Sequence, residues 1–204
     1  MRKYTGKSIR LGAAAVAIIA ALCSPIAASA ATTSTNTTIN ATISSTISMT
    51  TSTTVAVGVT PTASGAMSSA FDNVQVTTNS NNGYVLSFAD ADATTTLVSG
   101  ANSISADAGT QASPSTTLTN NAWGYRVDGV GGFGAGPTTA ETNIASSAFK
   151  WAGVPASASP NTLKTTATTA LNDQTKVWYG VKVDTTKPSG TYSDTVTYTA
   201  VTNS

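Results

Sequence analysis

The sequence predicts an all-β protein: an antiparallel β-sandwich of about nine strands with immunoglobulin-like or jelly-roll topology. Apolar residues recur at every second position in several short segments, and Gly, Pro and Asn separate these segments. Beyond residue 30, no segment shows the sustained i, i+3, i+4, i+7 spacing of an amphipathic helix. Only 9% of the residues are charged, which suits sheets whose polar faces carry hydroxyl groups.

Residues 1–30 have the features of a cleaved secretory signal peptide. An apolar stretch runs from Leu11 to Cys23, and Ala28-Ser29-Ala30 forms an A-x-A cleavage site. The stretch is about thirteen residues long, against roughly 20 for a membrane-spanning helix. Its basic flank consists of Arg2, Lys3, Lys7 and Arg10. We expect export, cleavage after Ala30, and no membrane span in the mature chain.

After the signal peptide, residues 31–38 form a flexible polar lead, and residues 39–204 form a single sandwich domain. The segment from Ile39 to Met49 predicts the first strand, because its apolar residues fall on odd positions. The second strand ends at Pro61. The alternating side chains of these two strands are Ile39, Ala41, Ile43, Ile47, Met49, Val55, Val57 and Val59.

The middle of the chain predicts further strands. Asn81-Asn82-Gly83 separates two alternating runs, which is the strongest short-range signal for a β-hairpin. Asp90-Ala91-Asp92 then ends the second of these strands. The apolar side chains that mark the strands are Val74 and Val76, Tyr84, Leu86 and Phe88, Leu97 and Val98, Ile104, and Trp123, Tyr125 and Val127.

The last third begins with a short strand marked by Phe149 and Trp151. Residues 161–173 are Thr-rich and predict one short strand and a turn. Lys187-Pro188-Ser189-Gly190 predicts the turn of a closing hairpin. The inward residues expected of that hairpin are Val177, Tyr179, Val181 and Val183 on one strand, and Tyr192, Val196, Tyr198 and Ala200 on the other.

The composition argues against most chemistries. There is no histidine, so the usual general base and the commonest metal ligand are missing. Cys23 is the only cysteine and lies in the signal peptide, so the mature chain has neither disulfide nor thiolate site. Without the signal peptide, six of the ten basic residues remain beside nine acidic residues, so the net charge of the mature chain is about −3. This balance disfavours nucleic acid as a partner, and we expect no enzyme and no cofactor.

Three weak signals for a site remain. Gly129 to Gly134 fits G-x-G-x-x-G, but no helix follows to receive a phosphate, so a surface loop is favoured. Asp90 and Asp92 are weak candidates for Ca²⁺, against the alternative that Asp-x-Asp favours a turn. The lysines could form isopeptide cross-links, or one of them could replace histidine as the base that activates a serine. The alternative is that the lysines are simply solvated.

The aromatic residues are the candidates for ligand binding. If Tyr179 faces inward, Trp178 lies on the opposite face of its strand. There it is either an exposed platform for a sugar or, if loops cover it, part of the core, which we favour. Trp151 and Tyr179 complete the candidate set for a glycan or peptidoglycan.

Four motifs resemble exported, Thr-rich surface proteins of small-genome bacteria with Gram-positive-type envelopes. They are Asn82-Gly83-Tyr84-Val85-Leu86-Ser87, Trp123-Gly124-Tyr125-Arg126, Val177-Trp178-Tyr179-Gly180-Val181-Lys182 and Pro188-Ser189-Gly190-Thr191-Tyr192. The late Trp-bearing strand and closing hairpin are also distantly similar to WxL-type cell-wall-binding domains, although Tyr179 and Gly180 follow Trp178 where that motif has x-Leu. These resemblances imply a cell-surface β-sandwich and no catalytic residues.

The sequence therefore favours an exported cell-surface protein with a structural or adhesive role. It would act by binding the cell envelope or by self-assembly, without catalysis. Residues 39–49 suit strand addition to a neighbouring copy, although pairing within their own domain is the simpler expectation. The alternative functions are a carbohydrate- or peptidoglycan-binding module that uses exposed Trp and Tyr and, less favoured, a lysine-based enzyme.

Overall fold

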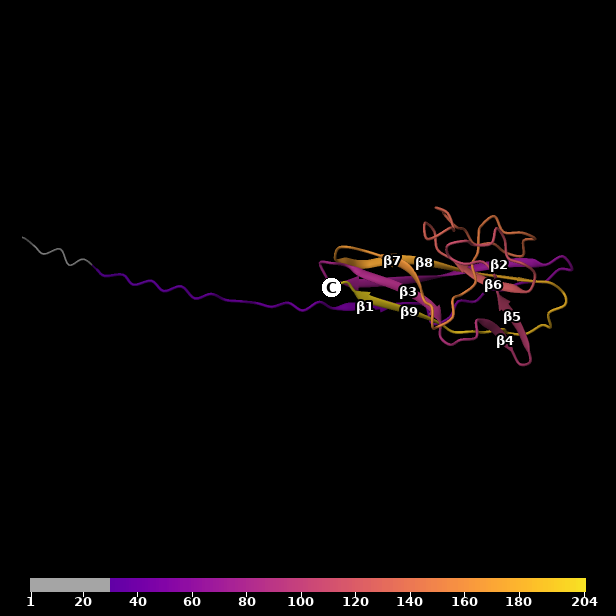
Figure 1. The fold of residues 1–204 in the computed structure, drawn as a ribbon, viewed down its shortest axis with the longest axis horizontal. Coiled ribbons are helices and arrows are strands. Elements are labelled where there is room, and N and C mark those ends of the chain that lie inside the picture. Colours follow the sequence, from indigo (N-terminus) through magenta and orange to yellow (C-terminus); the bar gives the residue numbers. More distant parts are fainter. Residues whose placement is uncertain (1–29) are drawn as a thin grey trace, which may run out of the picture. The chain divides into compact units, whose positions relative to one another are not determined.

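The structure is a computed structural model that describes residues 30–204. The predicted signal peptide lies outside the described residues except for Ala30. Residues 30–46 have no regular secondary structure, and residues 43–204 form one compact unit. The described part of the chain holds no helix long and apolar enough to span a membrane. Its strands (Figure 1) are β1 (Ile47–Thr50), β2 (Ala66–Thr78), β3 (Tyr84–Asp90), β4 (Thr96–Ser99), β5 (Asn102–Ala106), β6 (Ala122–Arg126), β7 (Asn161–Thr165), β8 (Ala170–Val183) and β9 (Val196–Thr202).

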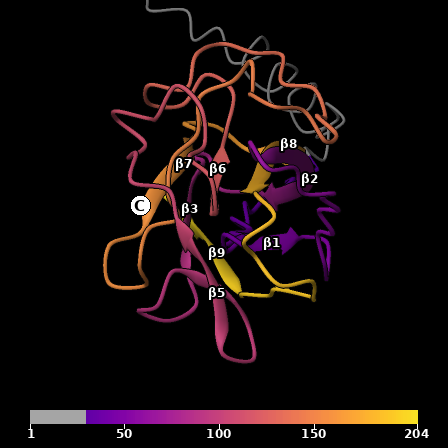
Figure 2. The same ribbon diagram turned by 90° about the vertical axis from the view of Figure 1, so that its right-hand side faces the viewer.

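These nine strands form two packed sheets, which confirms the predicted all-β, two-sheet class. The larger sheet has the order β1-β2-β8-β6-β5-β4, and the smaller has the order β7-β3-β9. The larger sheet curls into half of a barrel against the smaller one (Figure 2). The expectation of a wholly antiparallel fold is wrong at one pair, because β5 and β6 run parallel. Residues 107–121 supply the long connection that a parallel pair requires.

Neither predicted hairpin forms: β2 and β3, like β8 and β9, lie in different sheets, and the connection between them crosses from one sheet to the other. The turn before β3 brings the Gly83 N–H to the Ser80 carbonyl at 3.1 Å, with a positive φ of 77° at Gly83. A type I′ hairpin turn needs two consecutive residues with positive φ, and Asn82 does not have one. The chain therefore leaves β2 in the larger sheet and enters β3 in the smaller one.

The closing pair behaves in the same way. β8 pairs with β2 and β6, whereas β9 pairs with β3, so that Tyr84 lies opposite Thr202 and Asp90 opposite Val196. Residues 184–195 make the crossing, which is too long for a tight turn. The predicted strands were therefore present, but their predicted partners were wrong.

Three predicted strands are shorter than expected or absent. The first is reduced to β1, and Ile39 and Ile43 stay outside it. Residues 55–59 form no strand, although Val55, Val57 and Val59 pack against the core. Around Trp151 there are only isolated bridges, from Ser115 to Trp151 and from Tyr125 to Ala152. The alternation predicts on which side of the chain these side chains lie, but a β-strand also requires a hydrogen-bonded neighbouring strand.

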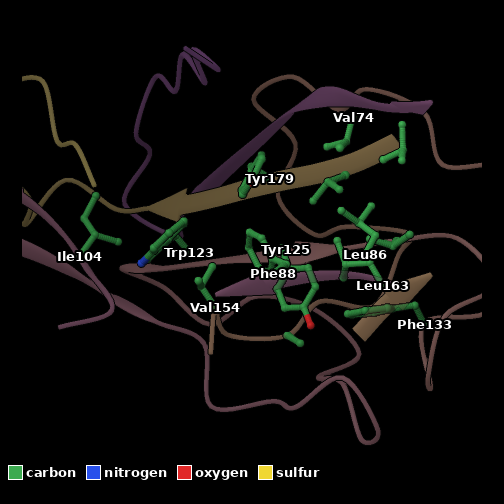
Figure 3. Close-up of a cluster of buried hydrophobic side chains, with 14 of the residues drawn as sticks. Val74, Leu86, Phe88, Ile104, Trp123, Tyr125, Phe133, Val154, Leu163 and Tyr179 are labelled. Carbon is green, nitrogen blue, oxygen red and sulfur yellow. The ribbon is translucent and has the colours of Figure 1, made fainter. Parts of the chain in front are cut away.

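The main core fills the space between the sheets (Figure 3). Phe88 of β3 lies at its centre, with its ring 4.7 Å from that of Tyr125 and 5.4 Å from that of Tyr198. Trp123 and Tyr125 point inward as predicted. A second cluster covers the other face of the larger sheet and consists of Met67, Leu118, Trp151 and Trp178. Loops therefore cover the face of β8 that carries Trp178.

We predict that Gly180→Ala destabilises the protein by about 1–3 kcal/mol, because overpacking a core has a cost of this order. A Cβ at Gly180 would lie 2.9 Å from the ring of Trp151, which is fixed in the second cluster. Gly58→Ala is the control, because nothing lies within 4 Å of a Cβ there. Urea denaturation measures both, and equal stability of the two variants would contradict the close packing of Trp151.

Candidate functional site

A groove lies over the inner face of the larger sheet, and both apolar and hydroxyl-bearing side chains line it. Two segments without regular strand structure border it: residues 51–61, which we call the strap, and residues 187–195, the connection into β9. The groove has a volume of about 850 Å³. This lies within the range of pockets that hold small ligands. Its floor is formed by Leu97, Ile104, Trp123, Tyr179, Val181 and Val183.

The strap is extended like a strand but has no hydrogen-bonded neighbouring strand. Val55, Val57 and Val59 are half-buried toward the core, and the residues between them are exposed. Within the described chain, the backbone of residues 53–59 forms no hydrogen bond. The strap is held at its ends, where the Ser52 N–H donates to Asp72 (2.9 Å) and the Thr60 N–H donates to Asn143 (2.7 Å).

Two tyrosines form a polar point in the groove. The hydroxyl oxygens of Tyr179 on β8 and Tyr198 on β9 are 2.6 Å apart, so a hydrogen bond joins the two sheets. Burial raises the pKa of both hydroxyls above the usual tyrosine value, and the charge of the nearby Asp72 adds to the effect. Both side chains are therefore neutral at physiological pH.

Asp194 lies at the edge of the groove, and only one of its carboxyl oxygens, Oδ1, accepts a hydrogen bond, from the Thr195 N–H (2.8 Å). Oδ2 of Asp194 is buried and has no partner, and the same holds for Oδ2 of Asp90. Burial, together with the nearby carboxylates of Asp90 and Asp92, raises the pKa of Asp194 to about 6. Asp194 therefore titrates nearer to neutral pH than an ordinary aspartate does.

Asp90 and Asp92 have the geometry of a turn. Oδ1 of Asp90 accepts the Asp92 N–H (3.0 Å), and Oδ1 of Asp92 accepts the Thr94 N–H (2.6 Å). These bonds within the loop are the ones that Asp forms in Asx turns. Across residues 30–204, no group of three or more His, Cys, Asp or Glu side chains is placed to hold a metal ion.

All three candidate aromatic side chains are buried. The exposed fractions of Trp178, Trp151 and Tyr179 are 3%, 0% and 7%. Trp178 and Trp151 belong to the second cluster, whereas Tyr179 faces the groove. Phe71 is the one exposed aromatic ring in the described part of the chain, and Lys176 lies over it at 4.5 Å.

The lysines mostly contact carbonyl groups and carboxylates. Lys164 Nζ lies 2.5 Å from Asp173 Oδ1. Burial alone raises the pKa of Asp173, but hydrogen bonds from Lys164 and Tyr84 outweigh it and lower the pKa below its usual value. An ion pair therefore accounts for this contact without an isopeptide bond. Among the described residues, no lysine hydrogen-bonds a serine hydroxyl.

Comparison with known protein families, with curated proteins and with solved structures finds no match. The groove must therefore be interpreted from its own geometry. Sequence reasoning missed it, although the alternation of Val55, Val57 and Val59 predicted the inner face of the strap. Nothing in the local sequence around Asp194 indicates its burial.

We predict that the protein becomes more stable as the pH falls from 7 to 5. Folding raises the pKa of Asp194, so the folded state binds a proton that the unfolded state, with a pKa near 3.8, does not. On folding between pH 5 and pH 7, the protein is expected to take up less than about one proton, at Asp194. Asp194→Asn removes this slope and stabilises the protein at pH 7.

Asp184→Asn is the control for that measurement. Hydrogen bonds from Thr186 lower the pKa of Asp184, so it is ionised in both states across this window. Thermal unfolding at pH 5, 6 and 7 decides the outcome. A slope that persists in Asp194→Asn would show that another group is responsible.

Proposed function

We propose that the protein is an exported cell-surface protein with a structural or adhesive role that acts by assembly, without catalysis. Export is supported by the basic, apolar and A-x-A features of residues 1–30. The β-sandwich supports the role of a module that presents surfaces, and its assignment to an immunoglobulin-like or jelly-roll topology belongs to the same proposal.

The observation that carries this proposal is the exposure of apolar side chains before β1. Ile39 and Ile43 have exposed fractions of 89% and 85%, and Ala41 lies between them on the same side of an extended chain. Residues 31–50 carry no charge. Exposed, aligned and uncharged apolar residues favour burial against another molecule.

Strand addition is the mode of assembly that suits this segment. An extended chain that joins a sheet gains backbone hydrogen bonds, and its alternate side chains enter pockets. Ile47 and Met49 are already used inside their own domain, because β1 pairs with β2. Residues 39–43 are therefore the part that remains for a partner. Among residues 30–204, no pair of exposed aromatic rings supports glycan binding as a second candidate.

We predict that the double variant Ile39→Asp, Ile43→Asp abolishes concentration-dependent multimers. Each carboxylate would have to be buried without a partner, which costs far more than the contact gains. The matched control, Asn40→Asp with Thr42→Asp, adds the same charge on the opposite side of the segment and keeps the multimers. Size-exclusion chromatography with light scattering measures both. A monomer at all concentrations before any substitution would refute assembly.

A further inference from the structure

The backbone of the strap is unpaired between its two ends. Both of its edges lack hydrogen bonds from residue 53 to residue 59, and it lies over the groove. Such an edge is a template for another strand. The outer edges of other strands are partly covered. In β4, the backbone of Val98 forms two hydrogen bonds with the backbone of Ser193. In β7, the Thr162 carbonyl accepts a hydrogen bond from the Gln111 side chain. β1 and β9 lie beside each other.

We propose that this groove is the acceptor for residues 39–43 of a second copy of the chain. The incoming segment pairs with residues 53–59 as an added strand and places Ile39, Ala41 and Ile43 in the groove. This inference rests on the proposed function and adds to it the location of the receiving site.

The spacing of the two segments matches. Three apolar side chains at alternate positions, Ile39, Ala41 and Ile43, meet a strap that itself places Val55, Val57 and Val59 at alternate positions. Two such segments pair with their apolar side chains on one face, because side chains alternate with a period of two. A groove of about 850 Å³ is large enough for three such side chains beside the strap.

The polar chemistry is also complementary. The incoming segment has backbone N–H groups, hydroxyls and the Asn40 amide, and it has no carboxylate. Asp194 borders the groove, and its carboxyl group lies beside those of Asp90 and Asp92. A donor-rich, uncharged strand suits this acidic edge, whereas an acidic peptide would be repelled by it.

Photo-crosslinking of the full chain tests the acceptor directly. A diazirine-bearing aliphatic amino acid replaces Ile43, which keeps the side chain apolar and of similar size. A mixture of ¹⁴N- and ¹⁵N-labelled protein is irradiated at a concentration where multimers form, and mass spectrometry identifies crosslinks between copies. The control carries the same probe at Thr42, on the opposite side of the segment.

We expect crosslinks between copies from position 43 to residues 51–61 and 187–198, at least about tenfold more abundant than from position 42. Crosslinks between copies that map instead to β4, β7 or the outer face of β8 would overturn this acceptor and leave assembly intact. Absence of both crosslinks and multimers would overturn the proposed function together with the acceptor. Multimers without any crosslink from position 43 would overturn the acceptor alone.

Discussion

The antiparallel pairing of β2 with β8 is the constraint on which the other elements depend. The two strands align from Ala66 opposite Val183 to Thr78 opposite Ala170, and both are interior strands of the larger sheet. Both faces of β8 must then be covered, because Trp178 and Tyr179 point to opposite sides. The smaller sheet and the strap cover one face, and the loops that carry Leu118 and Trp151 cover the other.

The smaller sheet does not cover the whole inner face of the half-barrel. Near the C-terminal end of β8, the cover consists of the strap and the connection into β9. Half-burying Val55, Val57 and Val59 gives less than the roughly 1.5–3 kcal/mol of a fully buried side chain. The backbone of residues 53–59 adds no hydrogen bonds to this gain. A segment held in this way has low local stability, which is typical of regions that bind partners.

Alternation and turn residues predicted much of the fold but not its connectivity. The facing of Val74, Tyr125 and Trp178 followed from the period of two, because that period depends only on the strand itself. The partners of β3 and β9 did not follow, because a turn signal such as Asn82-Gly83 places a reversal without saying which sheet the chain enters. The parallel pairing of β5 with β6 depends on the long connection between them, so local sequence patterns did not predict it either.

The candidate site was less predictable still. Ile39 and Val57 look alike in sequence, since both belong to alternating apolar runs. In the structure Ile39 is exposed, whereas Val57 is half-buried and packs against the core without joining a sheet. The groove is lined by segments that are far apart in the sequence, so no local pattern contains it or the burial of Asp194.

In the proposed assembly, the strap is an unpaired segment that gains its partner strand from a second copy. Amide hydrogen exchange of residues 37–45 and 53–59, followed from dilute to concentrated protein, tests it most directly. We expect fast exchange of both segments in the dilute protein and joint protection of both as multimers form. Protection of the strap in the dilute monomer, or fast exchange of the strap in the multimer, would contradict it.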